Sequence, residues 1–550
     1  MQTLNRADAI RRLRSERFDV VVIGAGMTGA GVAVDAAQRG LKVALIDAGD
    51  VAVGTSSKSS KMVHGGLRYL QQKEFRLVYE NLRERQRLLE NAPHLVRVLP
   101  FLIPLFGKDG VVSKTVARSY STALRIYDVT GGWRIGKRYQ KVTRQQALEH
   151  LPTLKVDRLV AGFLYFDARG DDARVALTLA QTAAHNFDAT VATYVRATNF
   201  SHDTDGRVTA VGVRDERTGD EFTIATASVV NATGVWADAI FTMAEQHASH
   251  RITPAKGIHI SVPHDRLPAD VAAVFAVPGD RRSIFVVPFE EAGFTYLGTT
   301  DTAYDGPLDE PMCTPEDIAY ILKAANGSTS SQLTEDDVTG VWAGLRPLLA
   351  PEHGEKVKER TADLSRRHKV IVNADGVVHI TGGKWTTYRQ MAEDTVDALC
   401  NQLGRKSKCK TAHLKLYGAP TTQAFATPDD ITLHLYRRFG TRAADILALI
   451  AEQPEWATPM IEGLPYCGAE FVYSARHEMA TTLEDLVTRR TRAHLQDARA
   501  TWAAAPAIAA LVAPEMGWSI EQQNIEVTQY RFLVAREFEA AGLRVEKESS

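Results

Sequence analysis

A glycine-rich turn close to the N-terminus is the pattern best suited to bind a cofactor. It lies between an apolar, β-branched run at 18–23 and a helix-prone run at 30–39, and its residues are Gly24, Ala25, Gly26, Met27, Thr28 and Gly29. The first two glycines permit a tight turn that brings backbone N–H groups to a pyrophosphate, and the third permits close packing of helix on strand. Asp47 follows the next strand, at 42–46, where a carboxylate can accept both hydroxyls of a ribose. This pattern predicts a dinucleotide site without separating NAD from FAD.

Three cations elsewhere in the chain are candidates for binding an anion. Arg68, Arg346 and Lys384 lie in stretches rich in glycine, threonine or apolar residues, where a solvated surface charge is less common. Arginine offers paired, charge-assisted hydrogen bonds to a phosphate. His259, in the apolar run 258–262, could act as a general base because imidazole titrates near neutral pH. Taken alone, that histidine is better explained as a core residue.

The elements that would position these groups begin with strands. An apolar strand is predicted at 229–234, about two hundred residues after the glycine turn, and it ends at Gly234. A strand that returns to the nucleotide-binding part in this way is expected for the adenine-side wall of a flavoprotein. Turn signals at 203–206 and 218–219 predict hairpins in the middle of the chain.

Helical patterns dominate the C-terminal part, at 443–451, 478–499 and 520–541. The expected organisation is an N-terminal extension at 1–17, a cofactor- and substrate-binding part at 18–400, a linker at 401–428 and a helical cap at 429–550, with the substrate-binding segments at roughly 92–160 and 245–345.

Composition argues against several classes of protein. The 550 residues are too many for one compact core, and their apolar and charged fractions of 45% and 24% are ordinary for globular domains. Lys and Arg total 65 against 66 Asp and Glu, so the chain lacks the basic surplus expected of a nucleic-acid-binding protein. No apolar stretch is long enough for a spanning helix, the N-terminus lacks the apolar segment of a signal peptide, and four cysteines without a CxxC pair fit a reducing cytosol. No metal site is predicted.

Several blocks of the sequence resemble those of FAD-dependent glycerol-3-phosphate dehydrogenases. The two most specific are TSSKSSKMVHGGLRYL at 55–70 and GGKWTTYR at 382–389. The similarity extends over nearly the whole chain, through further blocks at 256–259, 297–301, 344–347, 473–483 and 488–492.

The resemblance implies an α/β plus α fold: a glutathione-reductase-type Rossmann domain that binds FAD, an interleaved antiparallel-sheet substrate domain and a C-terminal helical cap. It also implies oxidation of sn-glycerol 3-phosphate to dihydroxyacetone phosphate, with hydride passed to flavin N5 and electrons to a membrane quinone. The protein would then be cytoplasmic and lie peripherally on the inner face of the cell membrane. A homodimer is left open.

The resemblance also assigns roles to individual residues. His259 becomes the candidate general base, with Arg346 holding the developing alkoxide and contacting the ligand. The phosphate is expected to bind Arg68, Tyr69, Lys384 and Arg346. FAD is expected to contact the glycine turn, Asp47 and Gly234. It is also expected to contact Thr55, Ser56, Ser57, His64, Gly65, Gly66, Gly382, Gly383 and Thr386.

Alternatives remain for the base and for the reaction. His64 is the rival base, and Asp301 could orient a base or cap a turn. An oxidase that delivers electrons to oxygen is the nearest alternative activity, although the resemblance links such oxidases to an extra insertion for which 550 residues leave little room. A flavin amine oxidase and a non-catalytic flavin-binding scaffold are more distant alternatives.

Residues 111–127 could contact a membrane. Taken as a helix, they place Lys114, Arg118 and Arg125 on one side and apolar residues, among them Tyr120 and Tyr127, on the other. The pattern is typical of a helix lying on anionic lipid, and equally of a surface helix packed on its own domain. The neighbouring run 98–106 predicts a buried strand, with an apolar patch facing the quinone as the alternative.

Overall fold

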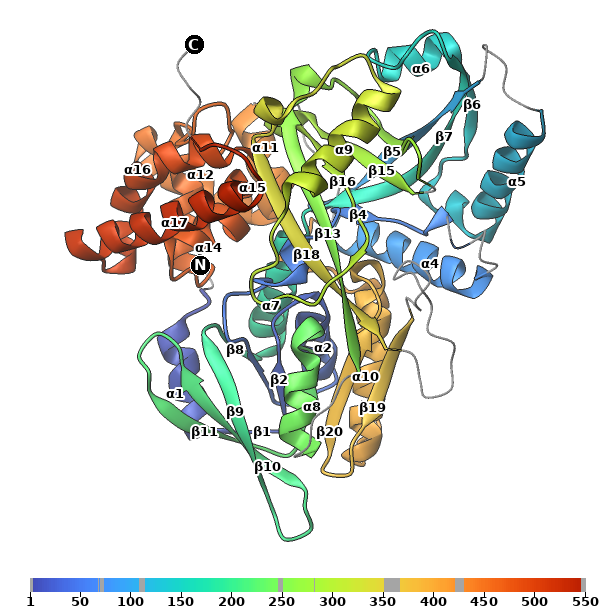
Figure 1. Cartoon of the computed structure of the whole chain (residues 1–550). Helices are drawn as coiled ribbons and strands as arrows, with labels where there is room; N and C mark the ends of the chain where they lie inside the picture. The colour runs from blue at the N-terminus through green and yellow to red at the C-terminus, as the bar shows by residue number, and fades with distance from the viewer. Residues whose placement is uncertain are drawn as a thin grey trace.

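The glycine-rich turn lies between strand β2 (Val20–Ile23) and helix α2 (Met27–Gln38), as predicted. The computed structural model describes residues 3–67, 69, 74–107, 114–245, 251–280, 282–350, 367–420 and 430–545 (Figure 1). Strand β2 is central in a six-stranded sheet whose strands run parallel except for one edge strand, β19. The order is β19 (His368–Val372), β20 (Val377–Gly382), β12 (Val229–Asn231), β2, β3 (Val43–Ile46) and β8 (Thr190–Ala192).

Two layers cover this sheet because successive residues of its strands face opposite sides. Val20 and Val22 join a core with the helices α2, α7 (Asp172–Phe187) and α10 (Tyr388–Gln402). Val21 and Ile23 join a second core on the other face. That face is covered by helix α1 (Arg6–Ser15) and a four-stranded sheet in the order β1 (Arg17–Phe18), β11 (Glu221–Thr226), β10 (Val208–Asp215) and β9 (Val195–His202). The return strand and both hairpins are therefore confirmed.

The substrate-side domain is built on a larger sheet that interleaves with the nucleotide-binding part in sequence. All its strand pairs are antiparallel except β14 with β5. Its ten-stranded sheet has the path β17 (Thr302–Ala303), β13 (Ile252–Pro263), β16 (Phe294–Gly298), β15 (Ser283–Phe289), β14 (Ala272–Ala276), β5 (Val96–Phe106), β7 (Leu159–Gly170) and β4 (Met62–Val63), with β18 (Gly340–Leu349) beside β13 and β6 (Gln140–Thr143) beside β7. The helices around it are α4 (Phe75–Asn91), α5 (Lys114–Thr130), α6 (Arg144–His150) and α9 (Pro315–Ser328), whereas α8 (Ala237–Glu245) packs against β20 and β9 of the nucleotide-binding part.

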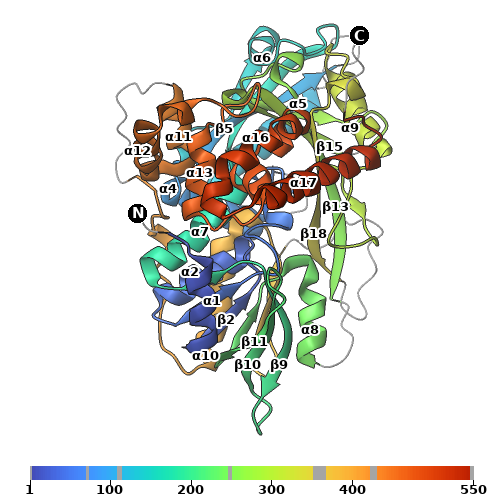
Figure 2. The same cartoon turned by 90° about the vertical axis from the view of Figure 1, so that its left-hand side faces the viewer.

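Helices make up the C-terminal part, which lies beside the upper half of the molecule in Figures 1 and 2. Its longer members are α11 (Asp430–Phe439), α12 (Ala443–Glu452), α13 (Gly468–His477), α16 (Ala498–Met516) and α17 (Ile520–Ala540). Among the helices in the described ranges, none combines the length and apolar character needed to cross a membrane.

The predicted continuous helix at 478–499 is wrong. The structure instead has short pieces, α14 (Leu483–Asp485), a π-helical turn (Leu486–Arg490) and α15 (Ala493–Gln496). Arg489 and Arg490 both donate to the buried carboxylate of Asp50 in the nucleotide-binding part. Because buried charges must be paired, these contacts override the helical pattern of the local sequence.

Candidate active site

One cavity of about 1220 Å³ gathers residues that lie far apart in the sequence. The predicted site residues in its wall are Gly24, Gly26, Met27, Thr28, Asp47, Thr55, Ser56, His64, Gly66, Tyr69, Gly234, His259, Arg346, Gly382, Gly383, Lys384 and Thr386. Ala25, Gly29, Ser57 and Gly65 are not in the wall but support it through contacts with their neighbours. Arg68 lies outside the described residues.

The glycine turn has the shape of a cradle for a pyrophosphate. Gly24 has a φ of +103°, and a Cβ atom there would lie 2.7 Å from the carbonyl oxygen of Ala232. A Cβ atom on Gly29 would lie 1.8 Å from the carbonyl oxygen of Gly24, so only glycine lets α2 start this close to β2. The backbone N–H groups at the start of α2 can therefore approach an anion without a side chain between them.

Acidic and hydroxyl side chains complete the cradle. The Asp47 carboxylate accepts hydrogen bonds from the backbone N–H of Ala25 (2.7 Å) and of Gly49 (2.9 Å). These bonds hold Asp47 at the mouth of the turn, and each oxygen keeps a further lone pair for a ribose hydroxyl. Ser56 Oγ accepts from the N–H of Met27 (2.8 Å), which places a hydroxyl at the start of α2. These groups fit the adenosine diphosphate portion of FAD.

A buried network holds the His64–Gly66 turn against the cavity. The N–H of Gly65 donates to the hydroxyl oxygen of Tyr127 (2.8 Å), and Tyr127 donates to Asp167 (2.7 Å). Arg85, fully buried, forms an ion pair with the same carboxylate. Burial and the nearby carboxylate raise the pKa of Tyr127 well above 10, so it remains a donor. These three supporting side chains come from strand β7 and two helices. The sequence placed Tyr127 on the apolar side of a helix and did not single out Arg85 or Asp167.

His259 is held rigidly in strand β13. It is 4% exposed, and its ring stacks on the Trp342 indole with centroids 4.9 Å apart. A Cβ atom on Gly298 would lie 2.2 Å from the imidazole, so glycine there makes room for the ring. Its Nε2 lies 2.7 Å from Ser60 Oγ, a partner that sequence reasoning missed inside the 55–70 block.

The charge state of His259 suits a base. Burial, and then the positive charges of Lys61 and Arg346, lower the pKa of His259 well below 6.5. The imidazole is therefore neutral at pH 7 and able to accept a proton.

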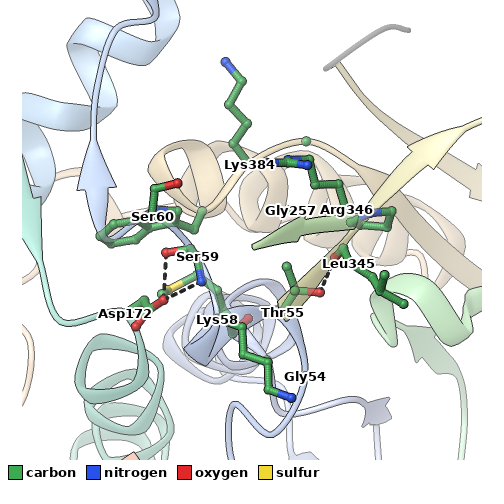
Figure 3. A pocket seen from close by; sticks show the side chains of 18 of the residues that line it. Gly54, Thr55, Lys58, Ser59, Ser60, Asp172, Gly257, Leu345, Arg346 and Lys384 are labelled. Atoms are coloured by element: carbon green, nitrogen blue, oxygen red, sulfur yellow. Dashed lines mark hydrogen bonds between the residues drawn. The ribbon is translucent and has the colours of Figure 1, made fainter. Parts of the chain in front are cut away.

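Two cations lie in the same wall. Arg346 Nη2 donates to Thr299 Oγ1 (3.1 Å) and to the carbonyl oxygen of Thr300 (3.1 Å), and Nη1 lies 3.5 Å from Asp301 Oδ1. Asp301, which the sequence left unassigned, thus orients the guanidinium. Lys384 Nζ lies 3.9 Å from the centroid of the Tyr69 ring, and Figure 3 shows Lys384 and Arg346 at the same cavity.

A buried charge cluster is centred on Asp172, which itself lines the cavity together with Ser59. Lys61 Nζ lies 3.0 Å from Asp172 Oδ1, and Arg492 from the C-terminal helices lies 3.2 Å from the same carboxylate. Ser59 also donates to Asp172 (2.7 Å; Figure 3). Burial, and next the charge of Arg492, lower the pKa of Lys61 to about 8. Lys61 Nζ also lies 5.1 Å from the centroid of the Trp342 ring, on which the His259 ring stacks.

The cavity is apolar at the end that faces strand β5. Its wall there consists of Phe101, Ile103, Pro104, Phe106, Tyr120, Tyr165 and Phe285. Within the described ranges, His, Cys, Asp and Glu side chains form no group of three that could hold a metal ion.

Two family patterns match the chain. Residues 19–389 match the family described as FAD dependent oxidoreductase, and residues 409–523 match the C-terminal domain of alpha-glycerophosphate oxidase.

Individual relatives agree with these matches. "Glycerol-3-phosphate dehydrogenase 2" of Mycobacterium tuberculosis is 41% identical over 546 residues, which cover 97% of this chain and 90% of that protein. The human mitochondrial glycerol-3-phosphate dehydrogenase is 34% identical, over 94% of this chain and 73% of that protein. A crystal structure of the Bacillus halodurans glycerol-3-phosphate dehydrogenase complexed with FAD superposes with a TM-score of 0.78 at 30% identity, covering 100% of this chain and 99% of that one. The chain therefore belongs to the FAD-dependent oxidoreductases and, within them, to the glycerol-3-phosphate dehydrogenase family.

Proposed function

We propose that this protein oxidises sn-glycerol 3-phosphate to dihydroxyacetone phosphate in the cavity described above. The observation that carries the proposal is that a neutral buried histidine, His259, lines the same cavity as the cations Arg346 and Lys384. The nucleotide cradle opens into the same cavity, and the family match supports FAD as the cofactor. For the chain as a whole, the proposal has residues 18–400 bind the nucleotide and the substrate, and residues 429–550 form a helical cap.

Each group has a role that follows from its chemistry. Lys384 and Tyr69, together with Arg68 outside the described residues, bind the phosphate dianion. His259 accepts the proton of the C2 hydroxyl, and stacking on Trp342 together with the Ser60 contact positions the ring that receives it. Arg346 holds the oxygen on which negative charge develops. FAD, when bound, supplies the hydride acceptor.

The first test is an anaerobic visible spectrum of the purified holoenzyme before and after addition of glycerol 3-phosphate. The flavin bands are expected to bleach, because the substrate reduces the cofactor when no acceptor is present. Glycerol 2-phosphate, whose C2 oxygen is esterified, is the matched control and should leave the bands unchanged. Flavin bands that persist with glycerol 3-phosphate would remove the substrate assignment while leaving the cofactor assignment intact.

We further propose a membrane quinone as the electron acceptor. The apolar end of the cavity, with Phe101, Phe106 and Tyr120 in its wall, offers a surface for an apolar ring and tail. Tyr120 belongs to α5, so this end lies against the helix that the sequence singled out for membrane contact. Reoxidation of the bleached enzyme by a short-chain ubiquinone, and not by dissolved oxygen, is the expected result. Rapid reoxidation by oxygen with formation of peroxide would assign the oxidase activity instead.

We place the membrane-facing surface on side chains other than the apolar stripe that the sequence predicted on α5. Tyr127 is buried and Tyr120 lines the cavity, so the apolar stripe predicted from the sequence packs on its own domain. Arg118 and Arg125 are exposed as expected, whereas the Lys114 side chain lies outside the described residues. The exposed large apolar side chains nearby belong to α4, α5 and the turn 132–135, and they are Phe75, Tyr79, Ile126, Val129 and Trp133. Apolar side chains flanked by arginines suit the interface of an anionic membrane.

Replacing Val129 with Asp should weaken membrane binding. Val129 is 81% exposed, and loss of one inserted apolar side chain lowers the partition coefficient by about tenfold. The measurement is co-sedimentation with phosphatidylglycerol-containing vesicles at low salt. Phe532→Asp, on α17 and 65% exposed, is the matched control and should bind as the unmodified protein does. Equal loss in both variants would contradict this choice of surface.

A further inference from the structure

A second cavity, of about 590 Å³, lies between the main body and the C-terminal helices. The body contributes the ends of strands β5 and β7, the start of α7 and the turn at 289–292. The C-terminal part contributes α11, the segment 457–466 and Arg492. Its volume is within the range of small-molecule sites in proteins.

The wall of this cavity is strongly basic. Its cationic side chains are Lys61, Arg97, Arg169, Arg174, Arg437, Arg438 and Arg492, against the carboxylates Asp171, Glu291 and Asp430. Most of these cations have acidic partners that face away from the cavity. Lys61 and Arg492 contact Asp172, Arg174 contacts Glu478, and Arg438 contacts Glu470. The charge is therefore balanced over most of the wall.

One end of the cavity keeps an excess of positive charge. Arg97 and Arg169 share a single carboxylate, Glu291, at 2.8 Å and 2.7 Å. Arg437, on α11, makes no hydrogen bond or ion pair with any residue in the described ranges. Burial lowers the pKa of Arg97 to about 10, and the positive charges of Arg169 and Arg437 act in the same direction, against the charge of Glu291. These three cations are set against Glu291 and, on α11 itself, against Asp430 in the same wall, so an excess of one positive charge remains.

Apolar and aromatic side chains form much of the rest of the cavity wall. Phe289, Tyr296, Tyr466, Leu95 and Pro459 line the cavity beside the arginines. The Arg169 guanidinium lies 4.2 Å from the centroid of the Phe289 ring, which fixes its plane. A ligand here would place an anionic group among the arginines and its carbon skeleton against this apolar wall.

We propose that this cavity is a binding site for a small phosphomonoester, separate from the catalytic cavity. A phosphomonoester is close to a dianion at neutral pH, and its negative charge suits the excess of positive charge that Arg97, Arg169 and Arg437 bring to this wall. Guanidinium groups bind phosphate through paired, charge-assisted hydrogen bonds. Because Arg97 and Arg169 belong to the body and Arg437 to the C-terminal helices, the bound phosphate links the two parts of the molecule.

The test is calorimetric titration of the FAD-loaded protein with glycerol 2-phosphate and with inorganic phosphate, in a buffer free of phosphate. Arg437→Gln should weaken binding by about tenfold or more, the loss of one charge-assisted contact. Since Arg437 has no carboxylate partner in the described ranges, its removal leaves no buried charge unpaired. Arg437→Lys, which keeps the charge but not the paired donors, should bind with intermediate affinity.

Two further variants locate the site. Arg442→Gln removes a nearby cation that does not line the cavity and should bind glycerol 2-phosphate as the unmodified protein does. Lys384→Met removes a cation of the catalytic cavity and should keep this binding. The ligand should also raise the unfolding temperature of the unmodified protein and not of Arg437→Gln, because it binds only the folded state. Undiminished binding in Arg437→Gln, loss of binding in Lys384→Met alone, or absence of binding in the unmodified protein would each overturn the proposal.

Discussion

Replacing His259 with Asn is expected to slow reduction of the bound flavin by glycerol 3-phosphate by about 10²-fold or more while leaving FAD bound. The imidazole lies 2.7 Å from Ser60 Oγ and stacks on Trp342, so the substitution removes the base without disturbing the nucleotide cradle. Asn is close in size to the imidazole but cannot accept a proton at neutral pH. Stopped-flow absorbance under anaerobic conditions measures the rate directly.

The pH dependence of flavin reduction provides a second test of His259 as the base. A base must be unprotonated to act, and the pKa of His259 lies well below 6.5 because of burial and the charges of Lys61 and Arg346. The rate of flavin reduction in the unmodified enzyme should therefore not fall as the pH is lowered to 6.5, and should fall only at lower pH. A decline centred near 6.5 would indicate a solvated histidine instead.

Two variants separate His259 from its neighbours. His64→Asn tests the rival base, and should reduce the flavin at a rate much closer to that of the unmodified enzyme. Ser60→Ala removes the contact with Nε2 and should give an intermediate rate, since the ring stays stacked on Trp342 but loses one restraint. If His64→Asn shows the large loss and His259→Asn does not, the role of base passes to His64.

Replacing Asp50 with Ala should lower the free energy of unfolding by about 3–5 kcal/mol, the usual cost of leaving buried charges unpaired. Asp50 is fully buried and accepts from Arg489 Nε (2.7 Å) and from Arg490 Nη1 (2.6 Å) and Nη2 (2.8 Å). Without the carboxylate, two arginines of the C-terminal helices face the nucleotide-binding part with one partner fewer. We expect the contact between the two parts to loosen first, with earlier loss of bound flavin on heating.

Urea denaturation, followed by tryptophan fluorescence and by flavin release, measures this effect. The control is Asp220→Ala, which removes one partner of an exposed ion pair with Arg14 (3.0 Å). Exposed pairs contribute about 1 kcal/mol or less, so this variant should unfold near the unmodified protein. Comparable midpoints for the two aspartate variants would show that the buried cluster does not hold the helices in place.

Local chemistry made the nucleotide-binding part predictable. Gly29 is a glycine because a Cβ atom there would strike the carbonyl oxygen of Gly24, only five residues earlier, and Gly24 has a positive φ that favours glycine whatever its distant neighbour Ala232 requires. The buried strands and the hairpins follow from apolar runs and turn residues in the same way. The signature blocks carried the rest of the cofactor assignment, because many of the residues expected to contact FAD lie in them and line the cavity.

The limits of local patterns appear where charges are buried. Residues 478–499 read as one helix, yet Arg489 and Arg490 turn out of it to reach Asp50. The apolar stripe of α5 could have faced lipid or protein, and only packing showed that Tyr127 lies inside.

The sequence by itself determined the family, the cofactor and the residue types from which a site for a phosphorylated alcohol could be built. Only the tertiary structure placed Ser60 against His259, Lys61 and Arg492 around Asp172, and Arg437 opposite Arg97 and Arg169. The physical reason is that short-range backbone preferences are encoded in neighbouring residues, whereas the energy of a buried charge depends on partners brought to it from distant parts of the chain.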